Sequence, residues 1–204
     1  QKTAYEMLRS LVGSEMCIRD SHGPPRTDST VLQVAVARLL GYRWPAEQDK
    51  EMRLAEEQRE WVKRAAELHS FEDPDGVVCL PALLRERPAA DRLRDVLAAA
   101  FPGKWSLSLE ESLLEAAGYR GKGLEAWLRD GFFQQHCQLF QHRPFVWHIW
   151  DGRKDGFSAL VNYHRLDRAK LEKLTYSYLG DWISRQKQAA QAGTPGAEGR
   201  LGAA

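Results

Sequence analysis

Two basic side chains stand at the centre of an otherwise aromatic and apolar stretch, "RPFVWHIWDGRKDGFSALVNYHRL" at residues 143–166. Arg153 and Lys154 lie between two glycine-bearing corners, where long cationic side chains reach outward and can bind a phosphate. Contacts of this kind hold a protein on the DNA backbone without reading the base sequence. The cations that we predict to contact DNA are Arg143, Arg153, Lys154, Arg165, Arg168 and Lys170. A solvated turn is the competing interpretation, since Asp151 and Asp155 lie beside the basic pair.

Charge is balanced over the whole chain but uneven along it. The sequence has 29 Lys and Arg against 28 Asp and Glu, so no strong overall field attracts a polyanion. Residues 45–75 hold 5 basic and 10 acidic side chains, whereas residues 143–187 hold 9 basic and 5 acidic ones. Any contact with DNA phosphates is therefore expected in the C-terminal part.

Histidines do not occur here in the pairs that a closed metal site needs. His136 and His142 are six residues apart, which places them on different sides of a helix. We therefore predict no metal site. His148 and His164 are each expected to satisfy one ring nitrogen within a hairpin while the ring packs on apolar neighbours.

Other potentially reactive residues lack the partners that catalysis needs. Ser158 has no GxSxG turn around it, and the glycines of "GYRGKG" at 118–123 follow a helix where a dinucleotide-binding loop needs a strand. The carboxylates of Asp73 and Asp75 fit a turn. We predict no catalytic and no cofactor-binding residue in this chain.

The three cysteines, Cys17, Cys79 and Cys137, are odd in number and form no CxxC pair. This pattern argues against a disulfide framework and favours a reducing compartment. No apolar run approaches the length of a membrane span, and no secretory signal is visible. We expect a cytoplasmic protein that makes no contact with a membrane.

Alternation of side chains predicts a β-hairpin at about 145–163 that presents the basic pair. Phe145, Trp147 and Ile149 are expected on one face, and the residues between them on the other. Both faces carry large apolar side chains, so both should be buried. The expected partners are the helices that we predict at 123–143 and 167–187.

Helical periodicity dominates the rest of the chain. Besides 123–143 and 167–187, the pattern predicts helices over 30–44 (ended by Gly41), 90–101 and 106–119 (ended by Gly118). It also predicts a short buried strand or extended piece at 77–80. Asp167 should cap the final helix. The predicted fold class is α+β, mainly α-helical, with one small antiparallel β-hairpin packed on helices.

Composition divides the chain into five segments. Residues 1–21 read as a non-native extension of the sequencing-adapter type, 22–44 as a lead-in with a short helix, 45–75 as an acidic surface helix and turn, 76–188 as the helical core with the hairpin, and 189–204 as an Ala/Gly-rich linker or truncated helix. Both ends look cut, so we expect a piece of a larger protein.

Four stretches together resemble a known family. They are "LQVAVARLLGYRWP", "DGVVCLPALLRERPAADRL", "LEAWLRDGFFQQHCQLFQHRPFVWHIWDGRKDGFSALVNYHRLDR" and "LTYSYLGDWISRQ". The chain is similar over about residues 31–188 to the region that follows the catalytic domain in large adenine-specific DNA methyltransferases. Those enzymes belong to type IIG restriction–modification systems and to BREX-type phage defence, and they occur in bacteria and archaea.

The resemblance implies a parent enzyme that transfers a methyl group from S-adenosylmethionine to the exocyclic nitrogen of adenine. The family holds the flipped adenine with an Asn-Pro-Pro-Tyr/Phe motif, which this sequence lacks, together with the Gly-rich cofactor loop. No catalytic residue is therefore carried over, and S-adenosylmethionine is expected only in the intact parent. The implied partners are double-stranded DNA and the missing methyltransferase domains.

An alternative from another class remains open. The chain would then be a helical protein-interaction module of a defence complex, without DNA binding or enzymatic activity. Its acidic segment at 45–75 would be the contact surface.

Overall fold

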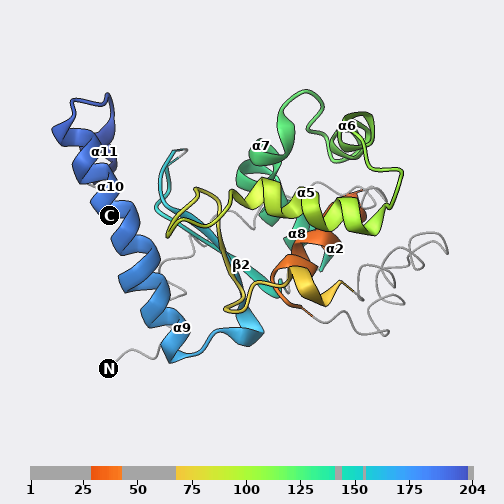
Figure 1. Cartoon of the computed structure of the whole chain (residues 1–204), viewed down its shortest axis with the longest axis horizontal. Helices are drawn as coiled ribbons and strands as arrows, with labels where there is room; N and C mark the ends of the chain where they lie inside the picture. Colours follow the sequence, from red (N-terminus) through yellow and green to blue (C-terminus); the bar gives the residue numbers. More distant parts are fainter. Residues whose placement is uncertain (1–28, 43–67, 141–143, 154, 202–204) are drawn as a thin grey trace.

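The computed structural model describes residues 29–42, 68–140, 144–153 and 155–201. Most of the acidic segment predicted as a surface helix, and the extension predicted at 1–21, lie outside these residues, as do Arg143 and Lys154. The described part is mainly helical with a small antiparallel sheet, which confirms the predicted fold class (Figure 1).

Helices precede and follow the sheet in the sequence. The elements before the hairpin are α2 (Ser29–Leu39), the 3₁₀ turn η1 (His69–Phe71), β1 (Val77–Cys79), α5 (Ala89–Ala100), α6 (Leu107–Ala116), α7 (Gly123–Asp130) and α8 (Phe132–Leu139). The remaining elements are β2 (Val146–Trp150), β3 (Ser158–Asn162), η2 (Tyr163–Arg165), α9 (Arg168–Glu172), the π-helix η3 (Lys173–Tyr178), α10 (Leu179–Gln191) and α11 (Ala197–Leu201).

The sheet has three strands in the order β1-β3-β2, all antiparallel. The hairpin β2–β3 forms as predicted, with Trp147 opposite Val161. The segment predicted as a short buried strand at 77–80 adds a third strand, because Val77 pairs with the same Val161 from the other side. β3 is therefore the central strand, and the prediction of a two-stranded hairpin alone was incomplete.

Both faces of the sheet are covered by helices, as the two-sided apolar pattern predicted (Figure 1). Val78, Val146 and Leu160 pack on one side, in a core built with α2, α5, α6, α7 and α8. The opposite face carries alternate residues of the same strands. It packs on the C-terminal helices, whose contributing side chains are Leu174, Tyr178 and Trp182.

One residue of the hairpin was assigned to the wrong face. Phe145 was expected beside Trp147 and Ile149, but it belongs to the opposite core together with Val146. Phe145 precedes the first paired residue of β2, so strand alternation does not fix its direction. Its ring instead stacks on Tyr42, with 3.5 Å between ring centroids.

The helix predicted over 123–143 is two helices, α7 and α8, that meet at Gly131. A Cβ atom on Gly131 would overlap the ring of Tyr119, so only glycine admits that ring beside the backbone. Trp127 and Phe132, on the two sides of the break, meet edge to face with centroids 5.5 Å apart. The break thus turns both large rings into the same core.

Glycines end α2 and α6 at the predicted positions. Gly41 and Gly118 have φ angles of 68° and 78°, in the left-handed region that glycine tolerates. The amide after each glycine bonds back into the helix, Tyr42 to Ala37 at 2.9 Å and Tyr119 to Leu114 at 2.7 Å. Both ends are therefore Schellman caps.

The C-terminal helix begins as predicted, with the Asp167 side chain accepting the Lys170 amide at 2.9 Å. Its middle turn is a π-helix, and α10 continues four residues beyond the predicted end, to Gln191. The segment predicted as a linker or truncated helix contains α11, whose Ala197 is fully buried. None of the described helices is long and apolar enough to cross a membrane.

A buried histidine joins α8 to the start of β2. His136 is fully buried, and its Nε2 accepts the Val146 amide at 3.2 Å while its Nδ1 lies 3.1 Å from Gln33 Oε1. Because Nε2 accepts, the proton of the neutral ring lies on Nδ1 and is donated to Gln33. Burial lowers the pKa of His136 to about 3 and that of His148 to about 4, from an ordinary value of 6.5.

Acid should therefore lower the free energy of unfolding already at mildly acidic pH. Both histidines stay neutral in the fold but take up a proton in the unfolded chain, so stability is full above pH 6.5 and falls as the pH drops toward 3–4. At pH 5 the loss should be about 2 kcal/mol for each histidine. Urea unfolding at pH 7.5 and pH 5, followed by circular dichroism, measures it.

A His136→Gln variant should show a smaller loss between the two pH values, because one of the two titrating groups is gone. His164, which is exposed, provides the matched control. An equal loss in the wild type and in His136→Gln would contradict the assignment.

Candidate nucleic-acid interface

The hairpin turn at 151–156 is organised by one carboxylate. Asp151 accepts the amides of Arg153 and Phe157, both at 3.0 Å, and the Gly156 amide bonds to the Arg153 carbonyl at 3.1 Å. A Cβ on Gly156 would overlap the Asp151 carboxylate, so glycine is required there. The negative charge of Asp151 therefore serves the backbone of the turn.

Arg153 is exposed at this turn, and no ion pair involves it among the described residues. Its guanidinium lies over α11, with Nη1 4.0 Å from where a Cβ on Gly199 would stand. Arg153 and its neighbour Lys154 stay a prediction for DNA contact, and Lys154 lies outside the described residues.

The other predicted cations do not gather at this turn. Arg143 lies outside the described residues, and the remaining three follow β3, which runs away from the turn. Arg168 pairs with Glu172 at 2.9 Å, and Lys170 pairs with Asp167. Their contact with DNA remains a prediction, and they do not form one surface with Arg153.

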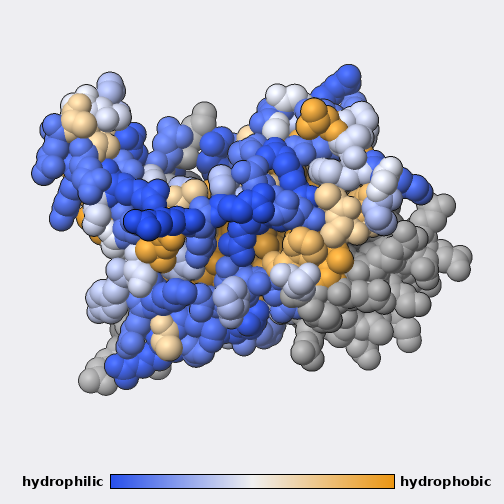
Figure 2. All heavy atoms as spheres, viewed as in Figure 1, coloured by the Kyte–Doolittle hydropathy of each residue, from blue (hydrophilic) through white to orange (hydrophobic). Residues whose placement is uncertain are grey.

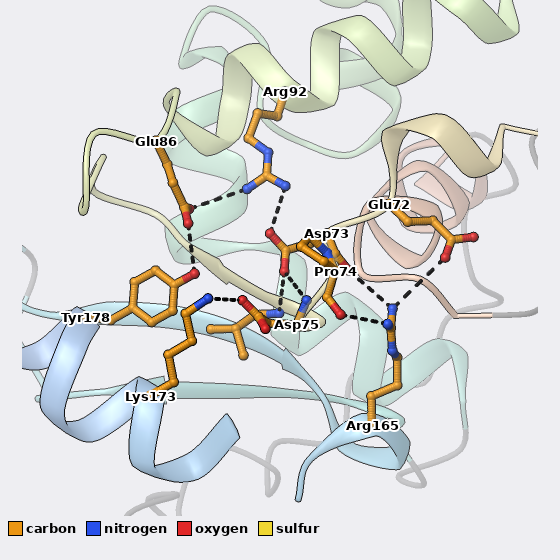
Figure 3. A network of polar contacts seen from close by, with 10 residues as sticks. Glu72, Asp73, Pro74, Asp75, Glu86, Arg92, Arg165, Lys173 and Tyr178 are labelled. Atoms are coloured by element: carbon orange, nitrogen blue, oxygen red, sulfur yellow. Dashed lines mark hydrogen bonds and ion pairs between the residues drawn. The ribbon is translucent and has the colours of Figure 1, made fainter. Parts of the chain in front are cut away.

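Arg165, the third of these cations, is half-buried and reaches toward the turn that precedes β1 (Figure 3). Its Nη1 and Nη2 donate to the carbonyls of Asp73 and Pro74, at 3.2 and 2.8 Å. The guanidinium is thus held by the turn that precedes β1. No sequence pattern indicated this contact, because the two partners are about ninety residues apart.

That turn is built around the buried carboxylate of Asp73, which is 3% exposed. Oδ1 accepts the amides of Asp75 and Val77 at 2.9 and 3.3 Å, and Oδ2 accepts Arg92 Nη2 at 2.9 Å (Figure 3). The prediction that Asp73 is a turn residue is confirmed. Its pairing with Arg92 on α5 was not foreseen.

The network continues to the C-terminal helices. Arg92 also lies 3.6 Å from Glu86, which accepts the Tyr178 hydroxyl at 2.8 Å, and Lys173 pairs with Asp75. Burial, followed by the bond to Glu86, raises the pKa of Tyr178 above its ordinary range. The bond to Asp75 raises the pKa of Lys173. The turn before β1 is thus joined to α5 through Arg92 and to the π-helix through Lys173.

A cleft of about 440 Å³ lies beside the network. Its lining residues are Leu39, Ser70, Phe71, Glu72, Asp73, Pro74, Asp75, Glu86, Arg87, Arg92, Asp95 and Lys173. The three cations among them are paired with carboxylates of the same lining, at Asp95, Asp73 and Asp75. Among the described residues, no group of three or more His, Cys, Asp and Glu could hold a metal ion. The charged side chains that line the cleft therefore pair with one another and connect elements of the fold.

Three side chains with catalytic potential, His148, Ser158 and Cys79, are buried in the sheet. His148 Nε2 lies 2.6 Å from Ser158 Oγ, as expected for a histidine that satisfies a ring nitrogen within the hairpin. His164 was expected to do the same, but it is exposed on η2, because the chain leaves the strand after Asn162. Burial raises the pKa of the Cys79 thiol, which makes it a poor nucleophile.

Comparison with known proteins finds an informative similarity. Over 102 residues the chain is 34% identical to the adenine-specific methyltransferase PglX of Lacticaseibacillus casei (strain Zhang). The match takes in 46% of this chain but 8% of that protein, so the chain spans a small part of its relative's length. No family model matches the chain. The chain thus contains a region related to a methyltransferase.

The hydrogen bonds and the ion pair of Asp73 should be essential for the stability of the fold. Asp73→Ala would leave two backbone amides without an acceptor and Arg92 without its closer partner, so we expect a loss of about 2–4 kcal/mol. Urea unfolding at neutral pH measures it. Asp155→Ala on the exposed hairpin turn is the matched control, and its effect should stay within about 0.5 kcal/mol. Equal effects of the two variants would contradict the role of Asp73.

Proposed function

We propose that this chain is a non-catalytic part of an S-adenosylmethionine-dependent DNA adenine-N6 methyltransferase of restriction–modification or phage defence. It links the catalytic core of the parent enzyme to its DNA-recognition parts. It works in the cytoplasm of a bacterium or archaeon, and its partners are double-stranded DNA and the other domains of the parent.

The similarity to PglX carries this proposal. A 34% identity extending over 102 residues joins the chain to a protein named as an adenine-specific methyltransferase. The stretches that resemble the methyltransferase family also run through β1, α7, α8 and the hairpin, which form one packed unit. A shared sequence over such a unit supports a shared place in the parent enzyme.

Chemistry is assigned to other parts of the parent. The sequence has no Asn-Pro-Pro-Tyr/Phe motif, and the glycines at 118–123 end α6 and begin α7. The buried pair His148 and Ser158 is sealed between strands and helices, where no adenine base reaches it. S-adenosylmethionine would bind to the catalytic domain of the parent.

Contact with DNA is assigned to the hairpin turn. Arg153 is exposed, and the nearby Asp151 is engaged by backbone amides, so the cation is not neutralised by a pair among the described residues. Such a turn supplies a phosphate contact and no base reading. The turn would therefore position the duplex for the recognition parts of the enzyme.

Salt dependence of DNA binding tests this assignment. The double variant Arg153→Ala/Lys154→Ala should weaken binding and flatten the plot of log affinity against log salt, by about 0.9 for each phosphate that the variant no longer neutralises. Fluorescence anisotropy of a labelled duplex, titrated with the chain at several salt concentrations, gives both quantities.

A second double variant controls for net charge. Arg120→Ala/Lys122→Ala removes two cations from the connection between α6 and α7, which lies away from the hairpin turn (Figure 1). It should leave the slope unchanged. A slope that responds equally to both double variants would remove the hairpin turn from the DNA interface. Capture of a protein partner by the chain, without DNA affinity, would favour the interaction-module alternative.

A further inference from the structure

The loop between β1 and α5 emerges at the same end of the sheet as the hairpin turn. β1 runs antiparallel to β3, so Cys79 pairs with Ala159 and the Leu80 amide bonds to the Ser158 carbonyl at 2.9 Å. Ser158 is the first residue of β3 after the turn. Residues 81–88 therefore leave the sheet next to residues 151–156, and both segments lie beside α10 and α11 (Figure 1).

The backbone of this loop is unusual at two consecutive positions. Leu84 and Arg85 have φ angles of 51° and 64°, and neither is glycine. Side chains with a Cβ atom are disfavoured in this left-handed region, and such strain persists only where neighbouring structure enforces it. Strained residues of this kind gather at binding sites and switches.

Neighbouring structure does hold the loop in place. The Leu84 amide donates to Asp181 Oδ2 at 2.9 Å, and Arg185 Nη1 donates to the Ala82 carbonyl at 2.7 Å. Leu83 is buried, and its carbonyl accepts the Glu86 amide at 2.9 Å. The loop is thus held on one side by its hydrogen bonds to α10 and on the other by the burial of Leu83 in the core.

The loop, held in this way, turns two side chains outward. Leu84 is 38% exposed, and Arg85 is exposed as well. Within the part of the chain that the structure describes, no ion pair or side-chain hydrogen bond involves Arg85, whereas the nearby Arg87 and Arg185 pair with Asp95 and Asp181. Arg85 therefore presents its full charge to solvent.

Two of the carboxylates at this end of the sheet are engaged within the fold, and a third, Asp155, is exposed on the hairpin turn. Asp151 serves amides of the hairpin turn, and Asp181 serves the Leu84 amide and Arg185. Figure 2 shows a mostly hydrophilic surface, with a few hydrophobic side chains, on the side of the molecule where α10 and α11 lie. Arg85 and Arg153 are thus two unpaired guanidinium groups, from segments about seventy residues apart, at one end of one sheet.

We propose that the loop 81–88 is a second DNA-backbone-binding element, in which Arg85 binds a phosphate of the same duplex that the hairpin turn contacts. This inference rests on the proposed function, because it assumes that the chain binds DNA. The bonds from Asp181 and Arg185 fix the backbone from which Arg85 projects. Because that backbone is already ordered, binding a phosphate costs only the freedom of the Arg85 side chain.

Four variants of the chain separate charge from backbone geometry. Arg85→Ala removes the charge and keeps the strain, Arg85→Lys keeps the charge, and Arg85→Gly removes both the charge and the strain. Arg120→Ala removes an exposed arginine, paired with Glu115, from the connection between α6 and α7 and is the control (Figure 1). Each is titrated against a fluorescein-labelled duplex at several salt concentrations, and its melting temperature is recorded.

Arg85→Ala should weaken DNA binding several-fold and lower the salt slope by about 0.9, while Arg85→Lys and Arg120→Ala keep the wild-type slope. Arg85→Gly should bind as weakly as Arg85→Ala but melt at a higher temperature, since glycine accepts the left-handed backbone. A rise in melting temperature together with a loss of affinity cannot come from damage to the fold.

The outcomes also separate this inference from the function on which it rests. A slope that falls for Arg153→Ala/Lys154→Ala but stays constant for Arg85→Ala would overturn the inference and leave the proposed function standing. The loop would then be free to dock a protein. Absence of DNA binding by the wild-type chain at low salt would overturn both.

Discussion

Strand β3 is buried along its whole length, and the rest of the structure follows from that constraint. It is the central strand, so β1 and β2 satisfy its backbone on both edges, and its side chains need an apolar partner on both faces. Helices from before the hairpin cover one face, and helices from after it cover the other. Neither layer alone could keep β3 out of water, which makes the early and late parts of the sequence depend on each other.

The two helical layers meet at the edge of the sheet where the chain enters β1, and the polar network connects them there. Asp73 stands where the chain enters β1, between α5 and the π-helix, and it binds Arg92 while its neighbour Asp75 binds Lys173. A buried carboxylate is tolerated only when donors surround it, and here backbone amides and a guanidinium do so. Arg165 binds the same turn through the carbonyls of Asp73 and Pro74. Arg153, by contrast, is exposed at the opposite end of the sheet, on the hairpin turn.

Local patterns in the sequence were sufficient to predict much of this fold, and contacts between distant segments were not. The alternation within the strands, the glycine stops at Gly41 and Gly118, and the Asp167 cap depend on neighbouring residues, and the structure has them. Phe145 and Tyr163, at the two ends of the predicted hairpin, lie outside the paired strands. The pairing of β1 with β3 joins segments about eighty residues apart, and a three-residue strand carries too little pattern to name its partner. The helix break at Gly131 likewise depends on the ring of Tyr119, which no periodicity reveals. For the candidate site, the exposure of Arg153 was predictable because turns expose their tips. The contact of Arg165 was not, because it depends on a turn far away in the sequence.

Leu84 and Arg85 are residues whose backbone conformation the sequence does not predict. A left-handed backbone is usually announced by glycine or asparagine, and here it is occupied by a leucine and an arginine, at a cost of about 1 kcal/mol or more for each. Glycine would serve the fold better at both positions. The stability that a side chain with a Cβ atom costs there is compensated within the fold by the clamp from Asp181 and Arg185. Arg85 makes no ion pair with a described residue, so its charge is available for the phosphate contact that we propose.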